Sequence, residues 1–85
     1  MSGEDDRRVH AVVGAMDVVR YDRAGKWYLE PHDPSLPRQA VNIDAAVNYI
    51  AWGVEQYGRS GVRVVLGRMG GTAFDRKVKA RGLAA

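Results

Sequence analysis

The apolar positions of the chain fall into a few short segments, and the spacing within each segment predicts its secondary structure. The first segment, Val9–Tyr21, is rich in valine and alternates only in part between apolar and polar positions. This pattern is typical of a long strand that is buried on much of both faces. Gly14 lies inside the segment and is expected to bend the strand.

A second strand follows a short turn. Residues 22–25 end in a glycine, which accepts the positive φ that tight turns require. The next segment, Lys26–Glu30, is rich in aromatic residues. Its alternation places Trp27 and Leu29 on one face and Tyr28 on the other. The two strands are expected to pair as a β-hairpin.

Three prolines within seven residues then interrupt the strand pattern. Because proline lacks a backbone N–H group and fixes φ, residues 31–37 are expected to form a loop. The next four residues, Arg38–Val41, predict a short edge strand that leads into a helix.

The helix has the clearest signal in the chain. Asn42 is a preferred N-cap residue, and Asp44 in the first turn suits the positive end of the helix dipole. Gly58 and Gly61 are expected to end the helix. Apolar side chains at helical spacing predict a buried stripe of Ile43, Val47, Ile50, Val54 and Tyr57.

The last third of the chain contains one clear strand and one segment that fits two structures. Val62–Leu66 alternates as a strand. As a helix, Thr72–Lys79 has an i, i+4 apolar pair and a start that resembles a capping box. As a strand, it pairs with Val62–Leu66 across a three-residue turn at Met69–Gly71, which places Leu66 opposite Phe74. We favour the hairpin because it sets apolar residues against apolar residues.

These elements predict an α+β domain with the order β-β-α-β-β. One amphipathic helix would pack on a four-stranded antiparallel sheet, which is the economical two-layer arrangement. The domain is expected to span residues 9–80, with residues 1–8 and 81–85 as disordered tails.

Three segments of the chain carry a resemblance. They are GKWYLEP at residues 25–31, NIDAAVNYIAWGVEQYG at 42–58 and VRVVLGRMGGTAFDRKV at 62–78. Over residues 18–78 the chain is similar to a widespread family of small ββαββ proteins of bacteria and phages, catalogued only as a domain of unknown function. The chain departs from the family pattern at Lys26, at Asn42 and at residues 66–68, where Leu-Gly-Arg stands for His-Gly-Arg. The resemblance implies the fold and a bacterial or phage accessory gene, and it brings no catalytic residues.

The composition is that of one small globular domain. Eighty-five residues, 46% hydrophobic and 27% charged, can form one modest core. The absence of cysteine excludes disulfides, thiol nucleophiles and cysteine-based zinc or iron–sulfur sites. No apolar run reaches the ~20 residues that span a membrane, and the charged N-terminus lacks the apolar stretch of a secretory signal. A cytoplasmic location without membrane contact is therefore expected.

The net charge of +3 is unevenly distributed. Residues 59–85 contain seven Lys or Arg residues against Asp75 alone, which gives this segment a charge of +6. Clustered cations attract phosphates, so non-specific nucleic-acid binding is an alternative function. The residues that would contact nucleic acid are Arg63, Arg68, Arg76, Lys77, Lys79 and Arg81.

Opposite its buried stripe, the helix carries a second group of apolar side chains. Ala45, Tyr49 and Trp52 fall within a narrow arc, and Gln56 continues the same face. Exposed Trp and Tyr residues are frequent in binding hot spots, so these four residues are predicted to form a partner-binding surface. A core this small also favours self-association, and a homodimer is expected.

The candidates for catalytic or metal chemistry are weak. Glu30, His32 and Asp33 lie together near the proline-rich loop, and such residues can act as a base or bind a metal. The stretch Gly67–Gly71 resembles a phosphate-binding loop but lacks its Lys-Ser/Thr ending. We interpret the first set as a polar loop and the second as a turn, and expect no enzyme activity, no cofactor and no metal site. The predicted function is a non-catalytic interaction module that self-associates and binds a protein partner.

Overall fold

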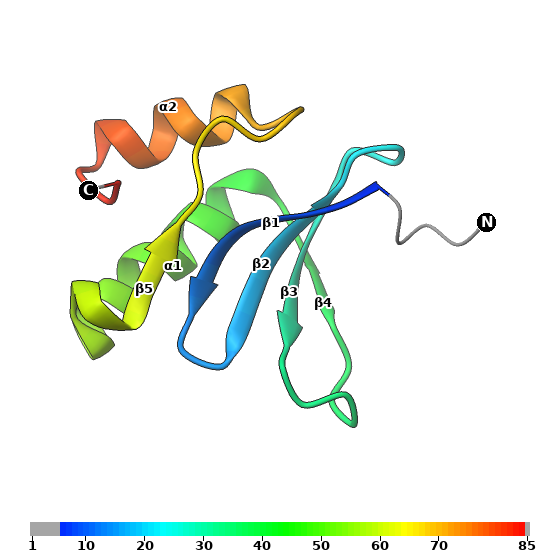
Figure 1. Ribbon diagram of the computed structural model, residues 1–85, viewed down its shortest axis with the longest axis horizontal. Helices are drawn as coiled ribbons and strands as arrows, with labels where there is room; N and C mark the ends of the chain where they lie inside the picture. The colour runs from blue at the N-terminus through cyan, green and yellow to red at the C-terminus, as the bar shows by residue number, and fades with distance from the viewer. Residues whose placement is uncertain (1–5, 85) are drawn as a thin grey trace.

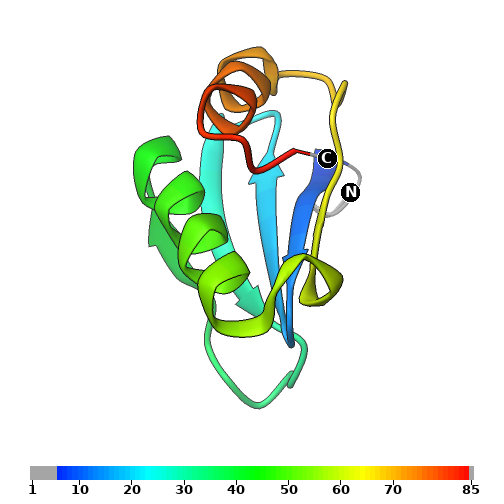
Figure 2. The same cartoon turned by 90° about the vertical axis from the view of Figure 1, so that its left-hand side faces the viewer.

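The chain folds into two layers, with two helices packed on one face of a five-stranded antiparallel sheet (Figures 1 and 2). This computed structural model describes residues 6–84. The α+β class is confirmed. The predicted four-stranded sheet with a single helix is wrong, since the sheet has a fifth strand and a second helix lies beside the first.

The first four strands form an antiparallel meander, and the fifth strand pairs with the first. In order they are β1 (Arg7–Val13), β2 (Met16–Tyr21), β3 (Lys26–Pro31), β4 (Gln39–Val41), α1 (Ile43–Tyr57), the 3₁₀ turn η2 (Arg59–Gly61), β5 (Val62–Val64) and α2 (Thr72–Ala80). The strand order in the sheet is β4-β3-β2-β1-β5, and every neighbouring pair is antiparallel. The chain therefore returns after α1 to the edge beside β1.

Some residues of the two predicted tails belong to the folded structure. Arg7 and Arg8 belong to β1, and Leu83 and Ala84 pack against the core. The other residues of the predicted N-terminal tail, apart from Asp6, and residue 85 lie outside the described residues. Strand structure and core packing therefore extend beyond residues 9–80 at both ends.

The first apolar segment is a hairpin and not one bent strand. Gly14 has a φ of 57° and begins a two-residue turn between β1 and β2, so the chain reverses there completely. The alternation is irregular because the register shifts between Val9 and Ala11, which leaves His10 as the extra residue of a β-bulge. Both His10 and Ala11 are fully buried as a result.

The second hairpin and the edge strand agree with the sequence pattern. Residues 22–25 form the turn, in which Gly25 has a φ of 66°. Trp27 and Leu29 are buried on the helix side of β3. The segment predicted at Arg38–Val41 is β4, which pairs only with β3 among the described strands.

The bounds of α1 also agree, but its buried face differs from the predicted stripe. The Asn42 side chain accepts a hydrogen bond from the backbone N–H of Ala45 at 2.7 Å, and the helix ends before Gly58, where φ is 73°. Tyr57 was predicted to be buried and is 50% exposed. The residues buried on α1 are Ala46, Val47, Ile50 and Gly53. Small residues occupy this face because α1 lies close to the sheet.

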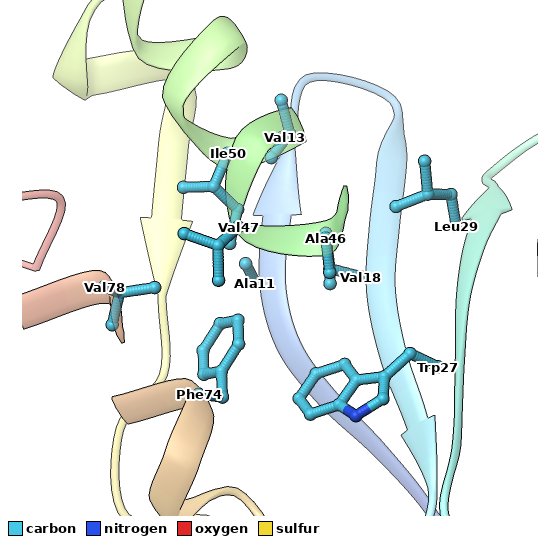
Figure 3. Close-up of a cluster of buried hydrophobic side chains, with 10 residues drawn as sticks. All are labelled: Ala11, Val13, Val18, Trp27, Leu29, Ala46, Val47, Ile50, Phe74 and Val78. Carbon is cyan, nitrogen blue, oxygen red and sulfur yellow. The ribbon is translucent and has the colours of Figure 1, made fainter. Parts of the chain in front are cut away.

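The predicted C-terminal hairpin is wrong, and the segment forms the second helix. The favoured pairing of Leu66 with Phe74 does not occur, since β5 ends at Val64 and α2 begins at Thr72. Phe74 and Val78 are both fully buried, because their i, i+4 spacing places them on one face of a helix. The ring of Phe74 stacks on Trp27 with centroids 5.1 Å apart (Figure 3). This contact between α2 and β3 is absent from any local pattern in the sequence.

Candidate interaction surfaces

Three aromatic side chains of α1 lie together at the surface. Tyr49 stacks on Trp52 with centroids 5.3 Å apart and an interplanar angle of 27°. Trp52 meets Tyr57 edge to face at 5.8 Å. Trp52 is 43% exposed, which is a large apolar area for one surface residue. We call Tyr49, Trp52 and Tyr57 the aromatic patch.

The predicted partner-binding residues do share this side of α1, with differences in exposure. Gln56 is exposed, whereas Ala45 and Tyr49 are half-buried and Tyr49 packs against the core. Tyr57 belongs to the patch and was missed, since its spacing matched the buried stripe. Its ring lies over Gly14 in the β1–β2 turn, at the end of the helix. The position of Tyr57 in the last turn of the helix is the sequence signal for its exposure.

A shallow hollow of about 270 Å³ adjoins the aromatic patch. Its lining includes Tyr49, Tyr57 and two residues of the β3–β4 loop, Asp33 and Leu36. Leu36 is 54% exposed and extends the apolar surface. Asp33 accepts hydrogen bonds from the Ser35 backbone N–H and hydroxyl, and these bonds lower the pKa of its carboxyl. The hollow is therefore apolar with an ionised carboxylate at its border.

The six basic residues of the predicted nucleic-acid surface do not form one surface. Arg63 lies on β5, opposite Val12 in the register and facing away from the helices. Arg76 and Lys79 are exposed on α2, in the helix layer. Arg68 lies in the loop before α2. The other two bind α1: Lys77 forms an ion pair with Asp44 at 2.9 Å, and Arg81 donates a hydrogen bond to Asn48 at 2.5 Å.

The three polar residues near the proline-rich loop also separate. His32 Nε2 lies 2.8 Å from Asp17, Asp33 binds Ser35, and Glu30 turns to other partners. Within residues 6–84, no group of three or more His, Cys, Asp or Glu side chains is placed to hold a metal ion.

Glu30 is the centre of a charged network that the sequence pattern did not reveal. Arg7 donates to Glu30 at 3.0 Å and also contacts Asp17 at 3.2 Å, while the Tyr21 hydroxyl donates to the other Glu30 oxygen. Burial acts to raise the pKa of Glu30, but these hydrogen bonds and the charges of Arg7 and Arg38 outweigh it and lower the pKa. Burial and the same carboxylate raise the pKa of Tyr21. The register that pairs Asp17 with Glu30 brings the network together.

The glycine-rich stretch Gly67–Gly71 leads into α2 instead of forming a hairpin turn. A Cβ atom at Gly71 would lie only 2.5 Å from Cε1 of the buried His10 ring, and one at Gly70 would overlap the Arg20 guanidinium. Asp75 accepts a hydrogen bond from the Gly67 backbone N–H at 2.9 Å. The glycines thus permit close packing of this loop over β1 and β2.

No protein-family model, curated protein or solved structure matches the chain. The similarity to a family of unknown function therefore stays a prediction. None of the helices in the described part of the chain has the length and apolar character needed to cross a membrane. By its architecture the chain is a small two-layer α+β protein that carries an exposed aromatic patch on its helix layer.

Proposed function

We propose that this protein is a non-catalytic interaction module that self-associates through the aromatic patch and binds a protein partner with the same surface. The exposure of Trp52 between two other aromatic rings carries the proposal. Removing such rings from water favours association at about 25 cal/mol per Å² of apolar area. Trp and Tyr are also the residues most often found in binding hot spots.

A second copy of the chain is the first occupant to expect. Patch-to-patch contact about a twofold axis brings Trp52 of each copy against apolar surface, and the carboxylate of Asp33 lies at the border of the adjoining hollow. The patch and Leu36 comprise four side chains, which is few beside the roughly 20–30 residues per partner of a stable interface. The dimer is therefore expected to be weak and to depend on concentration.

The test is the mass in solution over a concentration series, measured by light scattering after size-exclusion chromatography. The native chain should shift towards twice its monomer mass of 9.4 kDa at high concentration, and Trp52→Ala should remain monomeric. Arg76→Ala on the exposed side of α2 is the matched control and should still dimerise. A native chain that stays monomeric at every concentration, or a Trp52→Ala variant that dimerises normally, contradicts the proposal.

A further inference from the structure

The second face of the sheet lacks a helix among the described residues, since α1 and α2 both lie on the other side (Figure 2). Strand alternation assigns to this open face the residues that alternate with the core positions along each strand. They are Arg7, Val9 and Val12 on β1, Asp17, Val19 and Tyr21 on β2, Lys26, Tyr28 and Glu30 on β3, Ala40 on β4 and Arg63 on β5. We call this surface the open face.

Some side chains on the open face are covered by their neighbours. Val19 is fully buried although it points away from the helices, and its neighbours in the register are Val9 and Tyr28. Tyr21 and Tyr28 meet edge to face with centroids 5.5 Å apart. The guanidinium carbon of Arg38 lies 4.2 Å from the Tyr28 centroid and 4.9 Å from that of Tyr21. The two rings are nearly perpendicular, with an interplanar angle of 84°, and the Arg38 guanidinium lies over both. We call these three side chains the platform.

The charged side chains of the open face differ in their exposure to solvent. The carboxylate side chains of Asp17 and Glu30 are only 19% and 16% exposed, and Arg7 contacts both. Arg38 forms an ion pair with Glu30 at 3.6 Å, and half of its side chain remains exposed to an incoming ligand. Arg63 and Lys26 are exposed without a carboxylate opposite them in the register. An incoming molecule therefore meets cations first, with four Lys or Arg residues against two carboxylates.

From this arrangement we propose that the open face binds a single-stranded nucleic acid. Unpaired bases stack on aromatic rings and on guanidinium planes, which the platform of Tyr21, Tyr28 and Arg38 supplies. Phosphates would contact Lys26, which lies beside Tyr21 in the register, and Arg63 on the edge strand β5. The face of a five-stranded sheet is too wide to enter the groove of a duplex, which admits a helix or a two-stranded ribbon, so single strands are favoured over double strands. This proposal is independent of the aromatic patch, which lies on the helix layer.

The decisive experiment measures fluorescence anisotropy of a labelled dT oligonucleotide of about twelve nucleotides at ~50 mM salt, where phosphate contacts are strong. Tyr28→Phe keeps the ring and should bind like the native chain. Tyr28→Leu removes the ring and should weaken binding roughly tenfold. Arg38→Glu keeps both rings and removes the guanidinium that lies over them, and it should weaken binding at least as much.

Arg76→Glu is the matched control, since it makes the same change of charge on α2 and should weaken binding only slightly. Circular dichroism establishes that each variant is folded. The proposal is overturned if the native chain binds no single strand at ~50 mM salt, if a duplex of the same length binds equally well, or if Arg76→Glu matches Arg38→Glu. It is also overturned if a polyglutamate peptide displaces the oligonucleotide as well as unlabelled dT does, because an acidic protein segment would then be the better partner.

Discussion

His10 lies between the rings of Trp27 and Phe74, with centroids 4.7 and 5.1 Å away. It is fully buried, and neither ring nitrogen has a hydrogen-bond partner in the described residues. An imidazole in such a place packs as a neutral aromatic ring. The β-bulge puts it there, because the extra residue of β1 turns towards the helices.

We expect the free energy of unfolding to decrease as the pH falls from about 6.5 to about 4. Burial lowers the pKa of His10 from 6.5 to about 4, against the charges of Asp22 and Asp75 and with a smaller contribution from Arg20 and Arg68. In this window only the unfolded chain takes up the proton, so folding is disfavoured. The loss approaches ~3 kcal/mol below pH 4 and is absent above pH 6.5. Urea unfolding in pH steps measures it.

The control for this prediction is His10→Phe, which keeps an aromatic ring and removes the titrating group. Its unfolding free energy should change less between pH 6.5 and pH 4 than that of the native chain. Equal slopes for the two proteins would mean that another group titrates in this window.

Gly53 has no side chain, and this allows α1 to pack closely against β1. A Cβ atom at this position would overlap Cγ1 of Val13, which is on β1. We expect Gly53→Ala to destabilise the fold by about 1–3 kcal/mol, although alanine is the better helix former by about 1 kcal/mol. Val13→Ala should relieve the clash. The double variant should therefore lose less unfolding free energy than the sum of the losses of the two single variants. Additive effects in urea unfolding would contradict the assigned contact.

At the scale of elements, α2 completes the core that α1 leaves open. Phe74 and Val78 reach from α2 into the cluster formed by Trp27, Val47 and Ala11 (Figure 3). The helix carries only two buried residues, and its remaining side chains are mostly polar. Its stability therefore depends on tertiary packing and much less on its own nine residues.

Phe74→Ala is expected to cost about 3–5 kcal/mol of unfolding free energy, since it leaves a cavity between Trp27 and His10. This is a large part of the 5–15 kcal/mol typical of a domain. Thermal and urea unfolding followed by circular dichroism measure the loss. Arg76→Ala on the exposed side of the same helix should change stability by less than about 0.5 kcal/mol. A Phe74→Ala variant as stable as that control would show that α2 does not seal the core.

At the scale of the molecule, the aromatic patch and the open face lie in different layers of a structure whose principal extents are 37 × 29 × 18 Å. We expect the two proposed activities to be separable. Trp52→Ala should bind the dT oligonucleotide within about twofold of the native affinity, and Tyr28→Leu should keep the native dimer mass. Anisotropy and light scattering on the same preparations test both. A single variant that abolishes both activities while remaining folded would show that one surface serves both.

The local patterns predicted those elements whose signals lie within one segment. Asn42, Gly58 and the apolar spacing between them define α1, and the alternation around Trp27 defines β3. No local pattern predicts the charged network, because Arg7, Asp17 and Glu30 are far apart in the chain. Only the register of three strands brings them together.

The sequence by itself determined the α+β class, the helix that begins after Asn42, and the turn at residues 22–25, because capping, periodicity and glycine conformation act over a few residues. Only the tertiary structure decided that Thr72–Lys79 is a helix. The i, i+4 spacing of Phe74 and Val78 places them on one face of a strand as well as on one face of a helix. In the folded protein both side chains of the helix pack in the core cluster with Trp27 and Val47. The tertiary structure also decided that Tyr57 is exposed. Tyr57 has the spacing of the buried stripe, but it is the last residue of α1, and its burial depends on which neighbouring elements reach that end of the helix.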